Sequence, residues 1–231
     1  MMRPIHLDDR LRTIGELIRP GARVADVGCD HGYLICALTE AGRIPGGIAC
    51  DVKEGPLSQA RHEIEQRTLS DRIDCRLGDG LSVVSSDEAD DIVLAGMGGE
   101  LIASILEACP WPDKSGKKFL LQPMTRAPLL RRWLYAHGYQ IESETACMAA
   151  GRPYTVMLVS YTGKEVSLGE YDLYTYIGDL GAERSGAARE YIRRAAVALV
   201  KRENGLLGRS PDEAQRLRSL SNKMLAMIEG W

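Results

Sequence analysis

Hydrophobic residues up to position 161 follow two alternating patterns, short strand-like segments and longer stretches with helical spacing. Strands are predicted where a mainly apolar segment is bounded by glycine, proline or aspartate. These segments are residues 23–27, 47–52, 73–77, 91–95 and 118–122. Between them, apolar residues recur three and four positions apart at 7–18, 34–42, 56–69, 101–106 and 129–134. This alternation predicts an α/β fold, a mostly parallel sheet with helices on its faces.

The pattern changes toward the C-terminus. Residues 139–147 and 154–161 are expected to pair as antiparallel final strands. After Gly169 the strands stop, and two long stretches carry apolar residues at helical intervals. The expected seams are Ala188, Ile192, Ala195 and Leu199, and then Leu217, Leu220, Met224, Met227 and Trp231. We therefore expect two domains, an α/β domain over residues 1–163 and an antiparallel coiled-coil hairpin over 169–231.

The connection between the two long helices has its own signals. Asn204-Gly205 and Gly208 are expected to break the first helix. Ser210, Pro211 and Glu213 then supply an N-cap, a proline in the first turn and a capping-box glutamate for the second.

Composition is that of a globular chain able to bury a full core. The 231 residues are 45% hydrophobic, and no apolar run reaches the length of about 18 residues that suggests a membrane span. The first residues lack the apolar segment of a signal peptide, so we expect a cytoplasmic protein, a monomer or weak dimer without a membrane partner. Six cysteines without a Cys-x-x-Cys pair favour buried free thiols over a metal site or disulfides. A net charge of −3 gives no overall attraction to nucleic acid, so RNA binding would need a local basic face.

The most informative stretch is the loop after the first strand, Asp26-Val27-Gly28-Cys29-Asp30-His31-Gly32. Its glycines would let the backbone approach a ligand, and the helix beginning near His31 would present unpaired N–H groups. A nucleotide or a carboxylate could bind there, although an ordinary strand-to-helix turn uses the same residues. The spacing differs from the dinucleotide pattern G-x-G-x-x-G.

Later strands also end in residues suited to a ligand. Asp51 follows the second strand, where a carboxylate can accept hydrogen bonds from both ribose hydroxyls. Asp79, after the third strand, could accept an adenine amino group, and Gln122 ends the fifth. The turn Gly96-Met97-Gly98-Gly99 after the fourth strand favours close approach of a flat ligand. Because parallel strands end at one edge of a sheet, these residues predict a single site.

Charged residues outside the apolar stripes have two interpretations. In the leading helix, Asp8, Arg10 and Arg12 form either a solvated face, which we favour, or a lid over the ligand loop. A similar choice between a solvated face and an RNA-binding face applies to the basic residues expected along the first long helix, Arg184, Arg189, Arg193, Arg194, Lys201 and Arg202. The histidines His31, His62 and His137 share no spacing and are expected to be structural or solvated.

The ordered set of strand ends is similar to the class I methyltransferases. Asp26, Gly28 and Gly32 match the acidic-x-Gly-x-Gly-x-Gly pattern of their first motif, and Asp30 replaces the middle glycine. The segments Asp-Val-Gly-Cys-Asp-His-Gly-Tyr-Leu, Ala-Gly-Met-Gly-Gly, Leu-Gln-Pro and Gly-Arg-Pro-Tyr resemble the bacterial tRNA (adenine(22)-N1)-methyltransferase family over nearly the whole chain. In that family Asp30 is usual, whereas Asn often stands where this chain has Met124.

This resemblance implies a Rossmann-like domain that binds S-adenosyl-L-methionine, a C-terminal helical hairpin, and methylation of adenine N1 in tRNA. The cofactor-binding residues that it implies are Asp26, Gly28, Cys29, His31, Gly32, Asp51, Val52, Asp79, Gly80, Gly96, Met97 and Gly98. The expected substrate contacts are Arg10, Arg152, Tyr154, Arg189 and Arg193.

The expected chemistry needs little acid–base help, because adenine N1 already offers an in-plane lone pair. Enzymes that methylate the exocyclic amine usually carry Asn/Asp-Pro-Pro-Tyr after strand four, where this chain has the glycine turn. The product ring is cationic, so Asp30 and Gln122 are the candidate catalytic residues. Two alternatives are a small-molecule methyltransferase and an RNA-binding protein without catalysis, the second disfavoured by the intact Asp26, Asp51 and Asp79.

Overall fold

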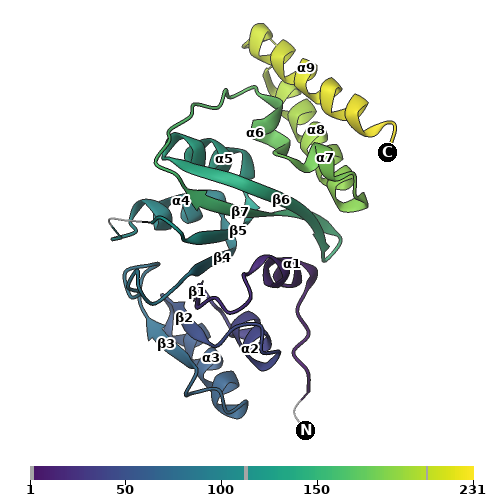
Figure 1. The fold of residues 1–231 in the computed structure, drawn as a ribbon. Coiled ribbons are helices and arrows are strands. Elements are labelled where there is room, and N and C mark those ends of the chain that lie inside the picture. The colour runs from purple at the N-terminus through teal and green to yellow at the C-terminus, as the bar shows by residue number, and fades with distance from the viewer. Residues whose placement is uncertain (1–2, 112–113, 207) are drawn as a thin grey trace.

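The computed structural model describes residues 3–111, 114–206 and 208–231, and within them seven strands form one sheet. The strand order is β3-β2-β1-β4-β5-β7-β6 (Figure 1). The parallel strands are β1 (Val24–Val27), β2 (Gly47–Asp51), β3 (Ile73–Leu77), β4 (Asp91–Gly98) and β5 (Lys118–Thr125). Next to β5, β7 (Arg152–Tyr161) runs antiparallel, between β5 and β6 (Tyr139–Ala149). The predicted Rossmann-like sheet with an antiparallel final strand is confirmed.

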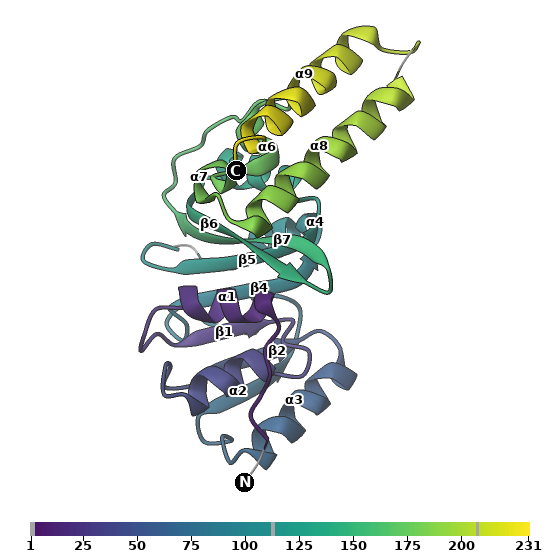
Figure 2. The ribbon, with the colours of Figure 1, turned by 90° about the vertical axis from the view of Figure 1, so that its right-hand side faces the viewer.

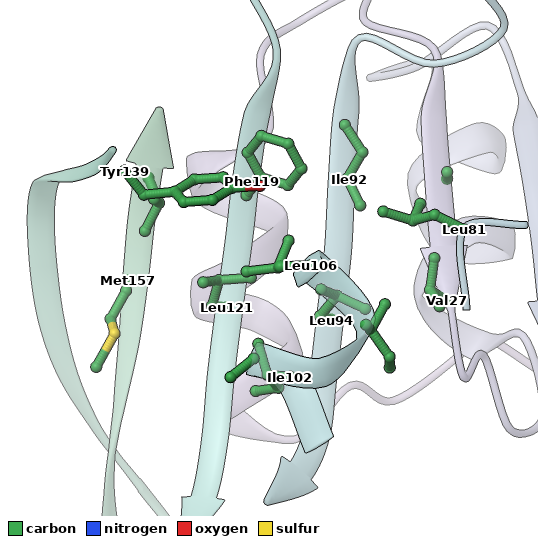
Figure 3. Packing of buried hydrophobic residues seen from close by; sticks show 14 of the residues in the cluster. Val27, Leu81, Ile92, Leu94, Ile102, Leu106, Phe119, Leu121, Tyr139 and Met157 are labelled. Atoms are coloured by element: carbon green, nitrogen blue, oxygen red, sulfur yellow. The ribbon is translucent and has the colours of Figure 1, made fainter. Parts of the chain in front are cut away.

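Helices cover both faces of the sheet because its central strands are apolar on both sides. On one face lie α1 (Asp9–Leu17), α2 (Tyr33–Glu40) and α3 (Glu54–Gln66), which Figure 2 turns toward the viewer. The other face carries α4 (Gly99–Glu107) and α5 (Ala127–Ala136). There Ile92, Leu94, Phe119 and Leu121 of the sheet pack against Ile102 and Leu106 of α4 (Figure 3).

The strands β4 and β5 extend beyond their predicted ends at residues 95 and 122. In the structure β4 continues through Gly98, with register shifts on either side of Met97, and Pro123 pairs with Met97 instead of ending β5. Such an irregularity interrupts the ladder locally, so a proline that lacks an N–H is tolerated there. As a result, the predicted glycine turn begins inside the sheet, where Gly96 lies next to Gln122.

The C-terminal segment forms the predicted helical hairpin, preceded by two short helices that the sequence pattern did not resolve. These are α6 (Leu173–Ile177) and α7 (Leu180–Glu183), and the hairpin is α8 (Gly186–Leu206) with α9 (Pro211–Ile228). Most predicted seam residues are buried, but Ala196 and Ile228 lie deeper than Ala195 and Met227. Arg184, which was expected on the first long helix, lies before it at the end of α7.

The predictions at the hairpin turn were confirmed in part. The break lies where it was expected, with Gly208 in the connection at a φ of 85°, but Asn204 and Gly205 still belong to the last turn of α8, which ends at Leu206. Ser210 stands at the N-cap of α9 without a side-chain cap bond, and Glu213 accepts a hydrogen bond from Arg202 at 2.6 Å, so no capping box forms. Glu213 therefore pairs with Arg202 of the neighbouring helix and does not form the expected local hydrogen bond at the start of α9.

A buried ion pair joins the segment before the hairpin to the sheet. Arg131 of α5 and Glu144 of β6 contact each other with both side chains fully buried. Arg131 also donates to the carbonyl oxygens of Thr175, at 3.1 Å, and Tyr176, at 2.9 Å, in α6. The expected domain boundary between residues 163 and 169 therefore separates groups that satisfy one another, and a truncation there would leave a buried charge pair without its partners.

Candidate active site

Two neighbouring cavities open at the carboxyl ends of the first four strands. The cavity that we call the β1 cavity has a volume of about 130 Å³, and the β2 cavity has about 350 Å³. Among the predicted residues, Arg10, Asp26, Cys29, Asp30 and His31 line the β1 cavity, whereas Asp51, Val52, Asp79, Gly80 and Met97 line the β2 cavity. Both are lined by Gly28, Ala95 and Gly96. One elongated ligand can therefore span the two.

Gly28 stands at the junction of the two cavities. Its φ of 72° lies in the left-handed region that favours glycine, and a Cβ at this position would overlap the terminal methyl of Met97. The N–H groups of Gly28 and Cys29 both donate to the carbonyl oxygen of Cys50, at 2.8 and 3.0 Å. These bonds tie the loop to the end of β2, so the residues after β1 and β2 face the same space.

Gly32 and Gly98 were predicted to contact a ligand, but they line neither cavity. A Cβ at position 32 would lie 3.2 Å from the Cβ of Ala60, so Gly32 allows α2 to approach α3. Gly98 is the N-cap of α4 and faces Thr125. Both glycines serve the packing of the scaffold in this structure.

Acidic residues surround both cavities, and Asp26 is the most deeply placed. Only 6% of it is exposed, and among the described residues its carboxylate has no hydrogen-bond or ion-pair partner. Burial, with the negative charges of Asp51 and Asp30 adding to it, raises the pKa of Asp26 to about 7. A buried carboxyl group without a partner is costly. A positively charged ligand would remove that cost.

The β2 cavity combines hydrogen-bond acceptors with an apolar wall. Asp51 is oriented by the backbone N–H of Lys53, which donates to its Oδ1 at 2.9 Å. Asp79 is exposed on the neighbouring loop, and Val52, which is 61% exposed, presents an apolar surface beside Met97. Hydroxyl or amino groups on a flat, partly apolar ligand would match this arrangement.

Gln122 does not line either cavity, but it hydrogen-bonds residues that do. It is fully buried, and its Oε1 accepts the N–H of Gly96 and a hydrogen from Nη1 of Arg10, both at 3.1 Å. Asp8 holds Arg10 from the other side at 2.6 Å and also caps α1 by accepting the N–H of Leu11. The favoured interpretation of Asp8 and Arg10 as a solvated face was therefore wrong.

Asp30 lies at the mouth of the β1 cavity in a left-handed conformation, with a φ of 52°. Its side chain is 71% exposed and lies 3.7 Å from Nε2 of His31, whose ring stacks on Tyr33. Gly32 is the N-cap of α2, so Asp30 is not a helix cap. Its carboxylate is available to a molecule that enters the cavity.

A larger groove lies beside this site, between the β5–α5 turn, the start of β7, and α8. We call it the arginine groove; its volume is about 450 Å³, and it is lined by Arg126, Arg152, Arg194, Arg202, Tyr154, Tyr176, Tyr191, Met124, Ala195, Ala198 and neighbouring residues. Of the predicted substrate contacts, Arg152 and Tyr154 line it, whereas Arg189 and Arg193 line neither the groove nor the cavities. We therefore leave Arg189 and Arg193 out of the substrate site.

The sequence contained a signal for the residues of the groove that prediction missed. Tyr191, Arg194, Ala198 and Arg202 recur three and four positions apart, so they share one face of α8 next to the hairpin seam. Arg189 and Arg193 are four positions apart on a different face. Helical phase, and not the mere density of basic residues, separates the two sets.

Other classes of site have less support. No group of three or more His, Cys, Asp or Glu side chains that could hold a metal ion occurs among the described residues. The six cysteines are free, and four of them are buried. In the described part of the chain, every helix is too short or too polar to cross a membrane.

Comparison with known proteins places this geometry in a family. A profile of the family described as "Methyltransferase domain" matches residues 7–157. The tRNA (adenine(22)-N(1))-methyltransferase of Bacillus subtilis (strain 168) is 37% identical over 175 residues, which are 73% of this chain and 74% of that protein.

Solved structures agree with the sequence comparison over most of the chain. The crystal structure of a candidate tRNA (m1A22) methyltransferase from Streptococcus pneumoniae has a TM-score of 0.85 and 31% identity, covering 96% of this chain and 100% of that one. A structure of that protein in complex with S-adenosyl-L-methionine has a TM-score of 0.78 and 32% identity, covering 92% and 98%. The chain therefore belongs to the tRNA (adenine(22)-N1)-methyltransferase family, as its motifs indicated.

Proposed function

We propose that this protein transfers a methyl group from S-adenosyl-L-methionine to N1 of adenine 22 in tRNA. The observation that carries the proposal is Asp26, a nearly buried carboxyl group without a protein partner, at the cavity beside the strand-end acids. A cofactor with a sulfonium and an ammonium group at one end and adenosine at the other meets the needs of both cavities. Family membership supports the same assignment.

The cofactor's polar groups can be matched to residues of the two cavities. Asp26 and Asp30 in the β1 cavity suit its positively charged end. In the β2 cavity, Asp51 suits the ribose hydroxyls and Asp79 the adenine amino group, while Val52 supplies apolar contact. When bound, S-adenosyl-L-methionine supplies an electrophilic methyl group on its sulfonium.

The protein's part in the reaction is to position the adenine and to offset charge. Adenine N1 carries an in-plane lone pair, so no strong general base is needed. As the adenine ring becomes cationic, the exposed carboxylate of Asp30 stabilises the transition state more than the ground state. Gln122 is a positioning residue, because it fixes the Gly96 backbone and Arg10 and is itself fully buried.

The test is to incubate the full chain with S-adenosyl-L-methionine and a tRNA transcript, and to map the product by mass spectrometry. We expect one methyl group on N1 of adenine 22, and none on a matched transcript with guanine at that position. Methylation at another atom or another base, or none, would overturn the assignment. A full chain is needed because removal of residues 169–231 would strip the buried Arg131 of its α6 partners. A tRNA substrate would also agree with the expected cytoplasmic location of the protein.

A further inference from the structure

The arginine groove has a charge balance suited to a polyanion. Four arginines line it, and no aspartate or glutamate does so among the described residues. Three of these arginines pair with acidic residues that do not line the groove: Arg126 with Glu100, Arg194 with Glu190, and Arg202 with Glu170 and Glu213. The exposed Arg152 has no hydrogen-bond or ion-pair partner among the described residues. Guanidinium groups bind phosphate oxygens with two parallel hydrogen bonds, so this lining suits phosphodiesters.

The groove also contains aromatic side chains, which binding of phosphate groups alone would not need. Tyr154, Tyr176 and Tyr191 line the same groove from β7, α6 and α8. In proteins that bind single-stranded RNA, unpaired bases stack on tyrosine rings and on arginine planes. The volume of about 450 Å³ lies within the range of sites that enclose a small organic ligand.

The side chain of Arg10 links the groove to the β1 cavity. Arg10 lines the β1 cavity, and its Nη1 lies 3.2 Å from Sδ of Met124 while its guanidinium lies 5.6 Å from the ring centre of Tyr154. Met124 and Tyr154 both line the groove. A strand of RNA lying in the groove would thus reach the mouth of the cavity with its next nucleotide.

We propose that the arginine groove is a subsite for an unpaired nucleotide that flanks the methylated adenine, with arginines on its phosphates and tyrosines on its base. This inference rests on the proposed tRNA substrate. Adenine N1 lies on the pairing edge of the base, so the target must leave its pair to be methylated. In this arrangement the groove holds an unpaired neighbour of the target along the strand while the target enters beside Asp30.

Two pairs of arginines allow an effect of the groove on tRNA binding to be distinguished from an effect of positive charge elsewhere on the surface. Arg193 and Arg194 are consecutive on α8, both pair with Glu190 at 2.7 Å, and their side chains are 52% and 45% exposed. Only Arg194 lines the groove, and it also donates to the carbonyl oxygen of Gly151 at 2.9 Å. Arg152 and Arg189 are both exposed, and neither forms an ion pair with another residue that the structure describes, but only Arg152 lines the groove. Arg194→Ala and Arg152→Ala should each weaken tRNA binding by about tenfold and lower the salt slope of log K by about 0.7 to 0.9.

A steric variant tests occupancy without removing charge. Ala198 is exposed on α8 and lines the groove, whereas the neighbouring Val197, which is 41% exposed, does not. Ala198→Trp should fill the groove and weaken tRNA binding by about tenfold or more, while Val197→Trp should change it less than about threefold. Thermal melting of each variant checks that the fold is kept, and calorimetry with S-adenosyl-L-methionine should give the wild-type affinity.

The outcomes separate this inference from the proposed function. If Arg193→Ala weakens tRNA binding as much as Arg194→Ala does, and Arg189→Ala as much as Arg152→Ala does, the groove is not a nucleotide subsite. The same conclusion follows if the Ala198→Trp and Val197→Trp variants bind tRNA equally well. In both cases the wild-type chain would still methylate tRNA. A wild-type chain that binds the cofactor but neither binds nor methylates tRNA would instead overturn the proposed function, and with it the inference.

Discussion

Replacing Asp26 by asparagine should make the free protein more stable near pH 8 while weakening its binding of S-adenosyl-L-methionine. The carboxyl group of Asp26 has a pKa of about 7 in the folded chain, because of burial and the charges of Asp51 and Asp30, against 3.8 for an ordinary aspartate. Between these values the unfolded chain binds fewer protons than the folded one. The free energy of unfolding therefore falls as pH rises from about 4 to 7.

The size of the effect follows from those two pKa values. At about 1.4 kcal/mol per pH unit, the interval between 3.8 and about 7 corresponds to at most about 4 kcal/mol. Asparagine cannot ionise, so the variant escapes this loss but keeps an unpaired polar group. We expect Asp26→Asn to be about 1 to 3 kcal/mol more stable than the wild type at pH 8, and nearly equal at pH 4.

Cofactor binding should show the opposite dependence. A cationic ligand favours the ionised carboxylate of Asp26, which is only about one tenth populated at pH 6 and about nine tenths at pH 8. The wild-type affinity should therefore rise by about tenfold between these pH values and level off above them. Asp26→Asn should bind more weakly at pH 8 and lose this dependence.

Urea unfolding of both cofactor-free proteins at pH 4, 6 and 8 measures the first effect, and titration calorimetry at pH 6, 7 and 8 measures the second. The difference in stability between variant and wild type is the quantity that isolates Asp26. A difference that does not change with pH would show that Asp26 ionises at its ordinary value, and the proposed account of its burial would fail.

Three further substitutions probe other parts of the molecule. Asp51→Ala should weaken S-adenosyl-L-methionine binding by about 1 to 3 kcal/mol in calorimetry, and an unchanged affinity would refute its ribose role. Asp30→Asn keeps a residue that tolerates positive φ, so a loss of about tenfold to a thousandfold in kcat at unchanged cofactor affinity is expected from the missing charge; wild-type turnover would reject that role. Arg131→Met leaves Glu144 buried without its cation and should cost about 3 to 5 kcal/mol in urea unfolding, whereas a near-zero change would show that water reaches the pair.

The sequence alone determined the elements of this protein, because they depend on spacing along the chain. Apolar runs and helical periodicities located the strands and the long helices, and the acids and glycines at the strand ends marked one edge of the sheet. Asp51 and Asp79 could be assigned to that edge in advance, since parallel strands bring their carboxyl ends together whatever their order. The motifs around Asp26 and Gly96, together with Leu-Gln-Pro and Gly-Arg-Pro-Tyr, indicated the family.

The ends of several elements depended on which segments meet in the folded protein, and the local sequence pattern carries little information about such contacts. Pro123 was expected to end β5, but an irregular pairing with Met97 extends both strands. Asn204-Gly205 was expected to end α8, but the helix continues one residue further to Leu206, which packs against the core of the hairpin. In each case the segment meets residues that are distant in sequence.

The chemistry of the site also depended on the tertiary structure. The raised pKa of Asp26 follows from its depth and from Asp51 and Asp30 nearby, and Gln122 acquires its role only when β5 places it against Gly96 and Arg10. On α8, Arg193 and Arg194 are consecutive in sequence, yet only Arg194 lines the groove. Consecutive helical residues point about 100° apart, so the docking of the helix on the sheet determines which of them lines the groove.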